Sequence, residues 1–233
     1  MSSNSVKATK RDHDQTPDDS SRILIVDDHP LVRKGLVDLI GDEKDLEVCC
    51  EAGTVSEALR LVNDDQPDLA IIDIALDGES GLELIKQIKS LHPDVSMLVC
   101  SAHDESLYAE RCLQAGAKGY VNKKVMMDEV INAIRRVIAG EVYLSPAMST
   151  KVIARMAFGK SDTPPSLVDA LSDRELEVFQ LIGQGMTTTE IAEQIHLSSK
   201  TVETYRQHIK RKMQLKNATE LVRTATAWTI ENL

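Results

Sequence analysis

The stretch Asp68-Leu69-Ala70-Ile71-Ile72-Asp73-Ile74 decides the fold class, because a short apolar run ends here in a carboxylate. Such a run is typical of a parallel strand that is buried on both faces. Some 46 residues before Asp73, the similar run Ile23-Leu24-Ile25-Val26 is followed by Asp27 and Asp28. That spacing fits one intervening strand and two crossover helices. Ligands bind at the carboxyl ends of strands in open α/β sheets, so the three carboxylates are expected to converge on one pocket.

Apolar segments and amphipathic helical segments alternate over residues 21–140, which predicts a parallel sheet with helices on both faces. The predicted strands are Ile23–Val26, Leu46–Cys50, Leu69–Ile74, Met97–Cys100 and Gly119–Val121. Among the helical segments, one opens with the capping box Thr54–Glu57, and another, Met126–Ala139, ends at Gly140. The fold class predicted for this part is therefore an α/β doubly wound five-stranded parallel sheet.

The pattern changes on either side of this domain. Residues 1–20 are polar and are expected to form a disordered tail. Residues 141–170 are expected to be a linker with one helix, which begins at Ser145-Pro146 and reaches Phe158. A connecting stretch with two prolines, 159–166, follows it. Residues 171–233 look helical throughout and carry capping patterns at Ser172, Thr187 and Asn217, so a small all-α domain of about four helices is predicted.

Composition narrows the function. The formal net charge is −10, yet residues 21–140 carry 13 Lys and Arg against 22 Asp and Glu, whereas residues 171–233 carry 8 of each. A local basic stripe over residues 200–212 is therefore present in an acidic chain.

No apolar run approaches the roughly 20 residues that span a bilayer, and the polar N-terminus predicts a cytoplasmic location with no membrane partner. The four cysteines show no metal-ligand spacing and are interpreted as free, buried thiols.

The carboxylates define the first candidate site. Three of them held close together repel one another, and a bound cation relieves that repulsion. Oxygen ligands from Asp27, Asp28 and Asp73 favour Mg²⁺, beside which one aspartate can accept a phosphoryl group. Ser101 and Lys123 follow the next two strands and are expected at the same edge. Taken singly, an Asp-Asp doublet is often only a helix cap, and a Ser or Lys after a strand is usually a loop residue.

The co-occurrence of these residues in order resembles the receiver domain of two-component response regulators. The matching motifs are Asp27-Asp28, Asp73 followed by Gly81, Ser101-Ala102, and Gly119-Tyr120-Val121-Asn122-Lys123. The resemblance implies that Asp73 accepts phosphate from a histidine kinase or a small phosphodonor. It also implies that Asp27, Asp28, Asp73 and the carbonyl of Ala75 hold Mg²⁺, that Lys123 pairs with the phosphate, and that Ser101 and Tyr120 act as the switch. Many receivers have proline four residues after the acceptor, whereas this chain has Asp77.

The second candidate site lies in the C-terminal domain. Apolar residues over 189–202 suit two helices that meet across a tight turn, and the following helix, Lys200 to Met213, has one apolar and one polar, basic face. Such a helix can enter the major groove of double-stranded DNA, although a solvated amphipathic helix of a bundle has the same pattern. The candidate DNA contacts are Lys200, Thr201, Glu203, Thr204, Arg206, Gln207, Lys210 and Arg211.

Nearly all of residues 171–233 resemble the LuxR-type helix-turn-helix DNA-binding domain, through Leu171–Val178, Gly185, Glu190-Ile191-Ala192, Thr201–Tyr205 and Ile209–Lys212. Joined to a receiver, this resemblance identifies the chain as a member of the NarL/FixJ class of response regulators. The class implies a homodimer when phosphorylated, with contacts from a last helix at about Thr219–Trp228. The apolar candidates are Leu221, Val222 and Ala225, which equally well suit the core of the domain itself.

The sequence therefore predicts a DNA-binding transcription regulator that is switched at Asp73 and is no enzyme beyond its own phosphorylation and dephosphorylation. One form of the switch implied by the family has the resting receiver covering the recognition helix through the Glu141–Ala170 connection. A phosphohydrolase is a rival, but Asp73-Ile74-Ala75 lacks the second acid of the usual Asp-x-Asp. The alternative function is a phosphorylation-independent regulator that works through protein contacts.

Overall fold

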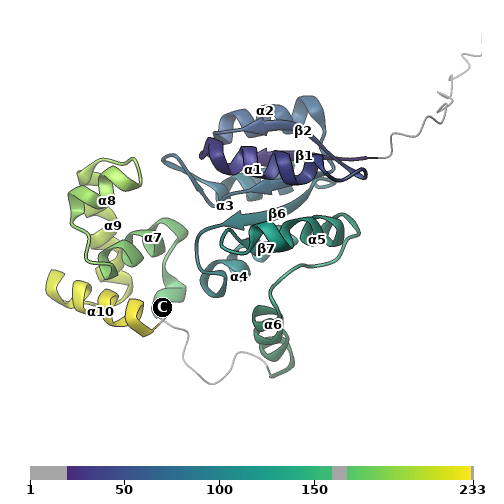
Figure 1. Ribbon diagram of the computed structural model, residues 1–233. Helices are drawn as coiled ribbons and strands as arrows, with labels where there is room; N and C mark the ends of the chain where they lie inside the picture. The colour runs from purple at the N-terminus through teal and green to yellow at the C-terminus, as the bar shows by residue number, and fades with distance from the viewer. Residues whose placement is uncertain (1–19, 159–166, 232–233) are drawn as a thin grey trace, which may run out of the picture.

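The computed structural model describes residues 20–158 and 167–231, and its first domain is built on one parallel sheet (Figure 1). The strand order is β2-β1-β3-β6-β7, which confirms the predicted doubly wound topology. The winding reverses between β1 and β3, and this is the point where a ligand crevice opens in such sheets. The strands are β1 (Ser21–Val26), β2 (Leu46–Ala52), β3 (Leu69–Ile72), β6 (Ser96–Ser101) and β7 (Gly119–Asn122).

Five helices cover the two faces of this sheet. Side chains alternate along β1, so Ile23 and Ile25 pack on one face while Leu24 and Val26 pack on the other. The first face is covered by α1 (Pro30–Gly41) and α5 (Met126–Ile138), and the second by α2 (Val55–Asp65), α3 (Gly81–Leu91) and α4 (Glu105–Ala115).

The chain turns sharply after β3, and here the predicted strand Leu69–Ile74 is wrong at its end. β3 stops at Ile72, and a hairpin follows, formed by β4 (Ala75–Leu76) and β5 (Glu79–Ser80). Gly78 at its tip has a φ of 71°, a left-handed conformation that glycine adopts without strain. The Gly81 amide donates to the Ile74 carbonyl, and a Cβ at position 81 would lie 2.0 Å from the Asp73 carbonyl oxygen. Only glycine fits beside the backbone of Asp73.

The connection to the second domain is partly built into the first. Tyr143 pairs with Gly119, and its carbonyl accepts from the Tyr120 amide, so this segment runs along the edge of β7. The predicted helix of the linker is present as α6 (Pro146–Phe158), and Met148 buries its side chain against the cluster on the α4 side. A 3₁₀ turn, η1 (Leu167–Ala170), was not expected. The predictions for 1–19 and 159–166 lie outside the described residues.

The second domain is all-helical, as predicted. It consists of α7 (Asp173–Gly183), α8 (Thr188–Gln194), α9 (Ser199–Lys212) and α10 (Ala218–Glu231). Complete capping boxes open α7 at Ser172 and α8 at Thr187. The Asn217 side chain accepts from the Glu220 amide at the start of α10. At Thr54, only half of the box forms, because the Glu57 carboxylate binds the Gly53 amide.

Two expectations about exposure are resolved here. Across the ranges that the structure describes, none of the helices has the length and apolar character to cross a membrane. Cys100 and Cys112 are buried thiols, but Cys49 and Cys50 are only half-buried, so the interpretation of all four as buried is wrong for that pair. Both lie on β2, an edge strand of the sheet.

Candidate phosphoacceptor pocket and helix-turn-helix

The carboxyl edge of the sheet gathers Asp27, Asp73 and Lys123 into one buried group. Asp27 and Asp73 are only 2% and 4% exposed, and the amide of Asp73 donates to the Val26 carbonyl at the end of β1. Lys123 Nζ lies 2.6 Å from Asp27 Oδ2 and 2.6 Å from Asp73 Oδ2. The structure therefore brings together the two strand ends, and a single ammonium bridges them.

The electrostatics of this group are balanced by that bridge. Burial raises the pKa of Asp27, and the negative charge of Asp73 adds to the rise, whereas Lys123 opposes it. For Lys123, burial acts against the charged form, but the two carboxylates outweigh it and raise its pKa. Lys123 is therefore a cation at neutral pH and holds the positive charge that an anionic group on Asp73 needs.

The neighbouring acid is less well satisfied. Asp28 Oδ1 is a buried oxygen with no hydrogen-bond partner among the described residues, although His29 Nδ1 lies 2.6 Å away in poor geometry. Ligand atoms of Asp27, Asp28, His29 and Asp73 all lie within 4.8 Å of one another. An orphaned carboxylate oxygen in a mainly oxygen donor set is the arrangement that a hard divalent cation satisfies. The residues present therefore fit Mg²⁺. His29 was not singled out from the sequence.

The two expected switch residues lie beside this pocket. Ser101 is fully buried at the end of β6, and its carbonyl accepts from the Lys123 amide. The Tyr120 ring is buried, and its hydroxyl donates to the His103 carbonyl over 2.8 Å. The Asn122 amide donates to the same carbonyl, so two side chains of β7 hold the loop between β6 and α4. Tyr120 and Asn122 therefore fix the backbone just before the start of α4.

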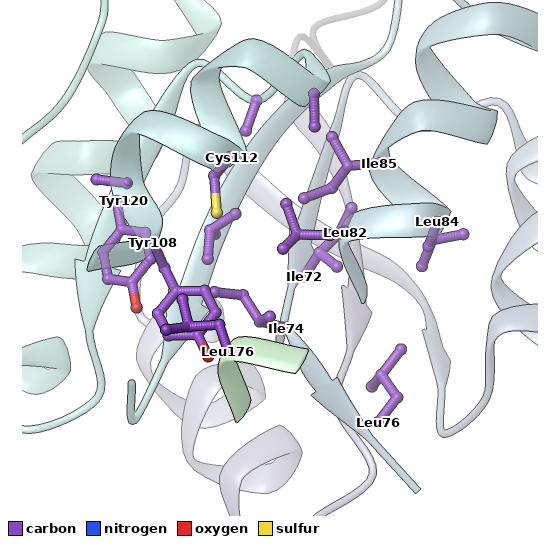
Figure 2. Close-up of a cluster of buried hydrophobic side chains, with 14 of the residues drawn as sticks. Ile72, Ile74, Leu76, Leu82, Leu84, Ile85, Tyr108, Cys112, Tyr120 and Leu176 are labelled. Atoms are coloured by element: carbon purple, nitrogen blue, oxygen red, sulfur yellow. The ribbon is translucent and has the colours of Figure 1, made fainter. Parts of the chain in front are cut away.

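That helix forms the contact with the second domain, a surface that the sequence did not predict. The Tyr108 hydroxyl donates to Gln180 Oε1 of α7 over 3.0 Å. Arg111 donates to the carbonyls of Val168 and Leu171 and to the Asp173 carboxylate. Figure 2 shows Leu176 of α7 lying against Tyr108 in the cluster that contains Ile74. We call these contacts between α4 and residues 168–180 the interdomain seam.

A second contact joins the loop after Asp73 to the helix-turn-helix. His196 Nε2 lies 3.1 Å from Asp77 Oδ1, and both side chains are about 60% exposed. Asp77 is the residue that replaces the usual proline of receivers, and His196 occupies the turn between α8 and α9 with a φ of 52°. The unusual acid therefore touches the turn that precedes the candidate recognition helix.

The polar face of α9 is exposed, which corrects the form of autoinhibition considered from the sequence. The receiver contacts α7 and the turn before α9 but does not bury the reading face, whose exposed members are Lys200, Glu203, Thr204, Gln207 and Arg211. Thr201, Arg206 and Lys210 are half-buried. The unpaired positive charge of the basic stripe, residues 200–212, is also smaller than the sequence suggested. Lys212 pairs with buried Glu175, and Arg206 lies 3.5 Å from Glu203.

The three dimer candidates differ in how much of each side chain is exposed to solvent. Leu221 and Ala225 are fully buried in the core of their own domain, the alternative that the sequence left open, so they are not surface contacts. Their period places them on the inner face of α10, where the Ala225 backbone closely approaches Gly183 of α7. Val222 is 42% exposed, and Ile230, which was not predicted, is also exposed.

Comparisons with known proteins find a family match for each of the two domains. Residues 23–135 match the response regulator receiver domain, and residues 169–225 match the bacterial regulatory proteins of the luxR family. The oxygen regulatory protein NreC of Staphylococcus carnosus is 37% identical over 86% of this chain and 94% of its own length.

Solved structures give the same picture. A two-component response regulator of the LuxR family from Aurantimonas sp. SI85-9A1 is 33% identical and covers 59% of this chain and 99% of its own, with a TM-score of 0.55. RcsB from Salmonella enterica serovar Typhimurium, bound to promoter P1flhDC in the presence of phosphomimetic BeF3-, has a TM-score of 0.59. It covers 89% of this chain and 99% of its own at 22% identity, a likeness that concerns the fold alone.

Proposed function

Since this chain belongs to the family of response regulators that join a receiver domain to a LuxR-type DNA-binding domain, we propose that it regulates transcription when Asp73 is phosphorylated. The observation that carries the proposal is the Lys123 ammonium, 2.6 Å from both Asp27 and Asp73 in a buried pocket. The phosphate would come from a histidine kinase or a small phosphodonor. Both the kinase domain that donates phosphate and the DNA are reached in the cytoplasm, where we place the protein.

The chemistry assigned to the pocket is a phosphoryl transfer. Asp27, Asp28, Asp73 and the Ala75 carbonyl would hold Mg²⁺, which when bound would supply positive charge against the acids and the phosphoryl oxygens. The Asp73 carboxylate attacks phosphorus, the donor leaves, and an acyl phosphate remains on Asp73. Lys123 already touches the acceptor and turns to a phosphate oxygen, while the Ser101 hydroxyl donates to another. The protein is thus active only in its own phosphorylation and dephosphorylation.

The effect of phosphorylation on the second domain would pass from Tyr120 through His103 to α4. A phosphate that recruits Ser101 and Tyr120 would remove the Tyr120 hydrogen bond to the His103 carbonyl, leave Asn122 as its remaining donor, and so loosen the start of α4. Because Tyr108 and Arg111 of α4 hold α7, that loosening would weaken the interdomain seam. A ligand moves such an equilibrium only through contacts that differ between the two states, and in this proposal the seam contacts are the ones that change.

The released domain would bind double-stranded DNA through α9. Glu203, Thr204 and Gln207 are the base-reading candidates, while Lys200, Thr201, Arg206, Lys210 and Arg211 would contact phosphates. In the structure Gln207 donates to Glu203 over 2.9 Å, so base reading requires this pair to separate. Dimerisation of the phosphorylated protein would use the exposed side of α10, at Val222.

Acetyl phosphate labelling in Mg²⁺ tests the proposal. Intact mass should rise by one phosphoryl group in the wild type and not in Asp73→Asn. Asp77→Asn, a matched change four residues away at an exposed acid, should still be labelled. Gel filtration and DNA-binding isotherms recorded in parallel should show a dimer and tighter binding only in labelled protein. Unchanged regulation by Asp73→Asn would instead support a regulator that works through protein contacts alone.

The salt dependence of DNA binding tests α9 separately. Lys210→Ala should lower the slope of log affinity against log salt by about 1, because one phosphate contact is lost. Lys44→Ala, an exposed lysine of the receiver, is the control and should leave the slope unchanged.

A further inference from the structure

Two adjacent cysteines on the edge strand β2 are placed together by an irregularity in the sheet. The register of β1 and β2 pairs Ile23 with Val48 but Leu24 with Cys50, so Cys49 is an extra residue in β2. Such a β-bulge sets two residues of one strand against one residue of its neighbour.

The packing of β2 is consistent with the bulge. In a regular strand, residues two apart share a face of the sheet. Here Val48 packs with the cluster under α1 and α5, whereas Cys50 packs with the cluster under α2, α3 and α4. The face therefore changes at Cys49, and the two thiols come together with their Sγ atoms 3.3 Å apart. Cys49 Sγ also contacts the Ile23 carbonyl at 3.4 Å.

The pair is suited to holding one atom between its sulfurs. If each sulfur is bonded at about 2.3 Å, a separation of 3.3 Å subtends roughly 90° at the shared atom. A tetrahedral Zn²⁺ would need the sulfurs roughly 3.8 Å apart, and a linear Cu(I) still farther. An angle near 90° belongs to a pyramidal trivalent centre such as arsenic(III), which has a lone pair and a strong preference for thiols.

A disulfide within the pair is a poorer fit. Adjacent Cα atoms lie about 3.8 Å apart across a trans peptide, below the usual disulfide span of about 4.4–6.8 Å. Burial and the neighbouring thiol also raise the pKa of Cys50 to about 12, so the thiolate needed for exchange is scarce. Condensation with an arsenic(III) oxide needs only neutral thiols: two S–H bonds and the As–O bond break, two As–S bonds form, and one water leaves without redox change.

We propose that Cys49 and Cys50 form a bidentate site for a trivalent metalloid, arsenic(III) or its chemical equivalents, independent of the phosphoacceptor pocket. Both residues are half-buried and lie on an edge strand that has no neighbour beyond it among the described residues. The other two cysteines, Cys100 and Cys112, are buried on separate elements and offer no such pair.

Phenylarsine oxide is the probe, used on the full chain after reduction. Wild-type protein should gain the mass of one reagent less one water, an adduct that excess monothiol leaves in place and 1,2-ethanedithiol removes. Cys49→Ser and Cys50→Ser should each weaken binding on the order of 100-fold, because bidentate attachment becomes monodentate. Cys112→Ala, a buried thiol elsewhere, is the matched control and should bind as the wild type does.

Peptide mapping makes the test independent of the folding of the variants. Trypsin releases residues 45–60 with both cysteines, whereas Cys100 and Cys112 fall in other peptides. Arsenic found on 45–60 of native wild-type protein supports the site. Absence of the adduct, its loss to monothiol, or its location on another peptide overturns the proposal.

Discussion

The two faces of the receiver sheet differ in what they are packed against. The cluster under α1 and α5 contains only receiver residues and the linker residue Tyr143. The cluster under α2, α3 and α4 continues through Tyr108 to Leu176 and the core of the second domain (Figure 2). One face therefore stabilises the receiver alone, and the other also sets the position of the DNA-binding domain. A change at Asp73 that moves the shared face would therefore reach the second domain.

The largest effect is expected from a substitution in the cluster under α1 and α5, which contacts no described residue of the second domain. Ile134→Ala, at a fully buried position of α5, should lower the free energy of unfolding of the receiver by about 2–5 kcal/mol through lost burial and a cavity. Trp228 is the single tryptophan and lies in α10, so its fluorescence reports the second domain. In urea, the circular dichroism transition should move while the Trp228 transition moves little.

Leu176→Ala is the counterpart on the shared face, where it is 1% exposed. Because Leu176 packs against residues of both domains, both transitions should move together. A Trp228 transition that shifts as far with Ile134→Ala as with Leu176→Ala would remove the distinction between the two faces.

A smaller effect is expected from the seam itself. Arg111→Gln removes three hydrogen bonds to the segment that leads into α7, and should weaken domain docking by about 1–3 kcal/mol. The unphosphorylated protein should then expand in small-angle scattering and bind DNA more tightly. Arg60→Gln removes only an exposed ion pair with Asp64 and is the control. Unchanged scattering with Arg111→Gln would mean that apolar contacts alone dock the domains.

The difference between the two regions also explains what the sequence could predict. Asp27, Asp73 and Lys123 follow strands and Ser101 ends one, and the order of parallel strands brings strand ends to one edge whatever the helices do. No comparable rule predicts which residues meet at the interdomain seam. Amphipathic periodicity marks an apolar face on α4 and on α7 but does not say that Tyr108 meets Gln180, 72 residues away.

The same limit applies to α10 and to the hairpin. The spacing of Leu221, Val222 and Ala225 fits a dimer face and a core face equally, and burial alone separates them. The contact of Asp77 with His196 depends on a hairpin that periodicity did not predict and on a left-handed turn residue. Neither strand nor helix patterns encode contacts between loops.

Glu175 gives the second domain a pH-dependent contribution to its stability. Burial acts to raise the pKa of Glu175, but the Lys212 ammonium and hydrogen bonds from Ser172 outweigh it and lower the pKa. A lowered pKa contributes stability above the unfolded value, about 4.3, and that contribution is lost as the pH falls through the folded pKa. Glu175→Gln should therefore cost about 1–3 kcal/mol at neutral pH and progressively less below pH 4.3.

Thermal unfolding followed by Trp228 fluorescence measures this gap in stability between the wild type and Glu175→Gln at each pH. His208 also faces Glu175, with Nδ1 3.7 Å from Oε1, so the comparison is made against His208→Gln as well. A gap between the wild type and Glu175→Gln that stays constant down to acid pH would assign the stability to packing and not to the ion pair.

The smallest effect is expected at the contact between Asp77 of the hairpin and His196, which lies outside the interdomain seam. His196 and Asp77 are about 60% exposed, and exposed ion pairs contribute about 1 kcal/mol or less and are screened by salt. His196→Ala and Asp77→Ala should each change the DNA affinity of the resting protein less than about fivefold, and only at low salt. A double-mutant cycle isolates the pair. A coupling of several kcal/mol would contradict this, since the hairpin that follows Asp73 would then hold the helix-turn-helix directly. The shared face would extend from α4 to the phosphoacceptor loop itself, and movement of Tyr120 would not be needed to release the second domain.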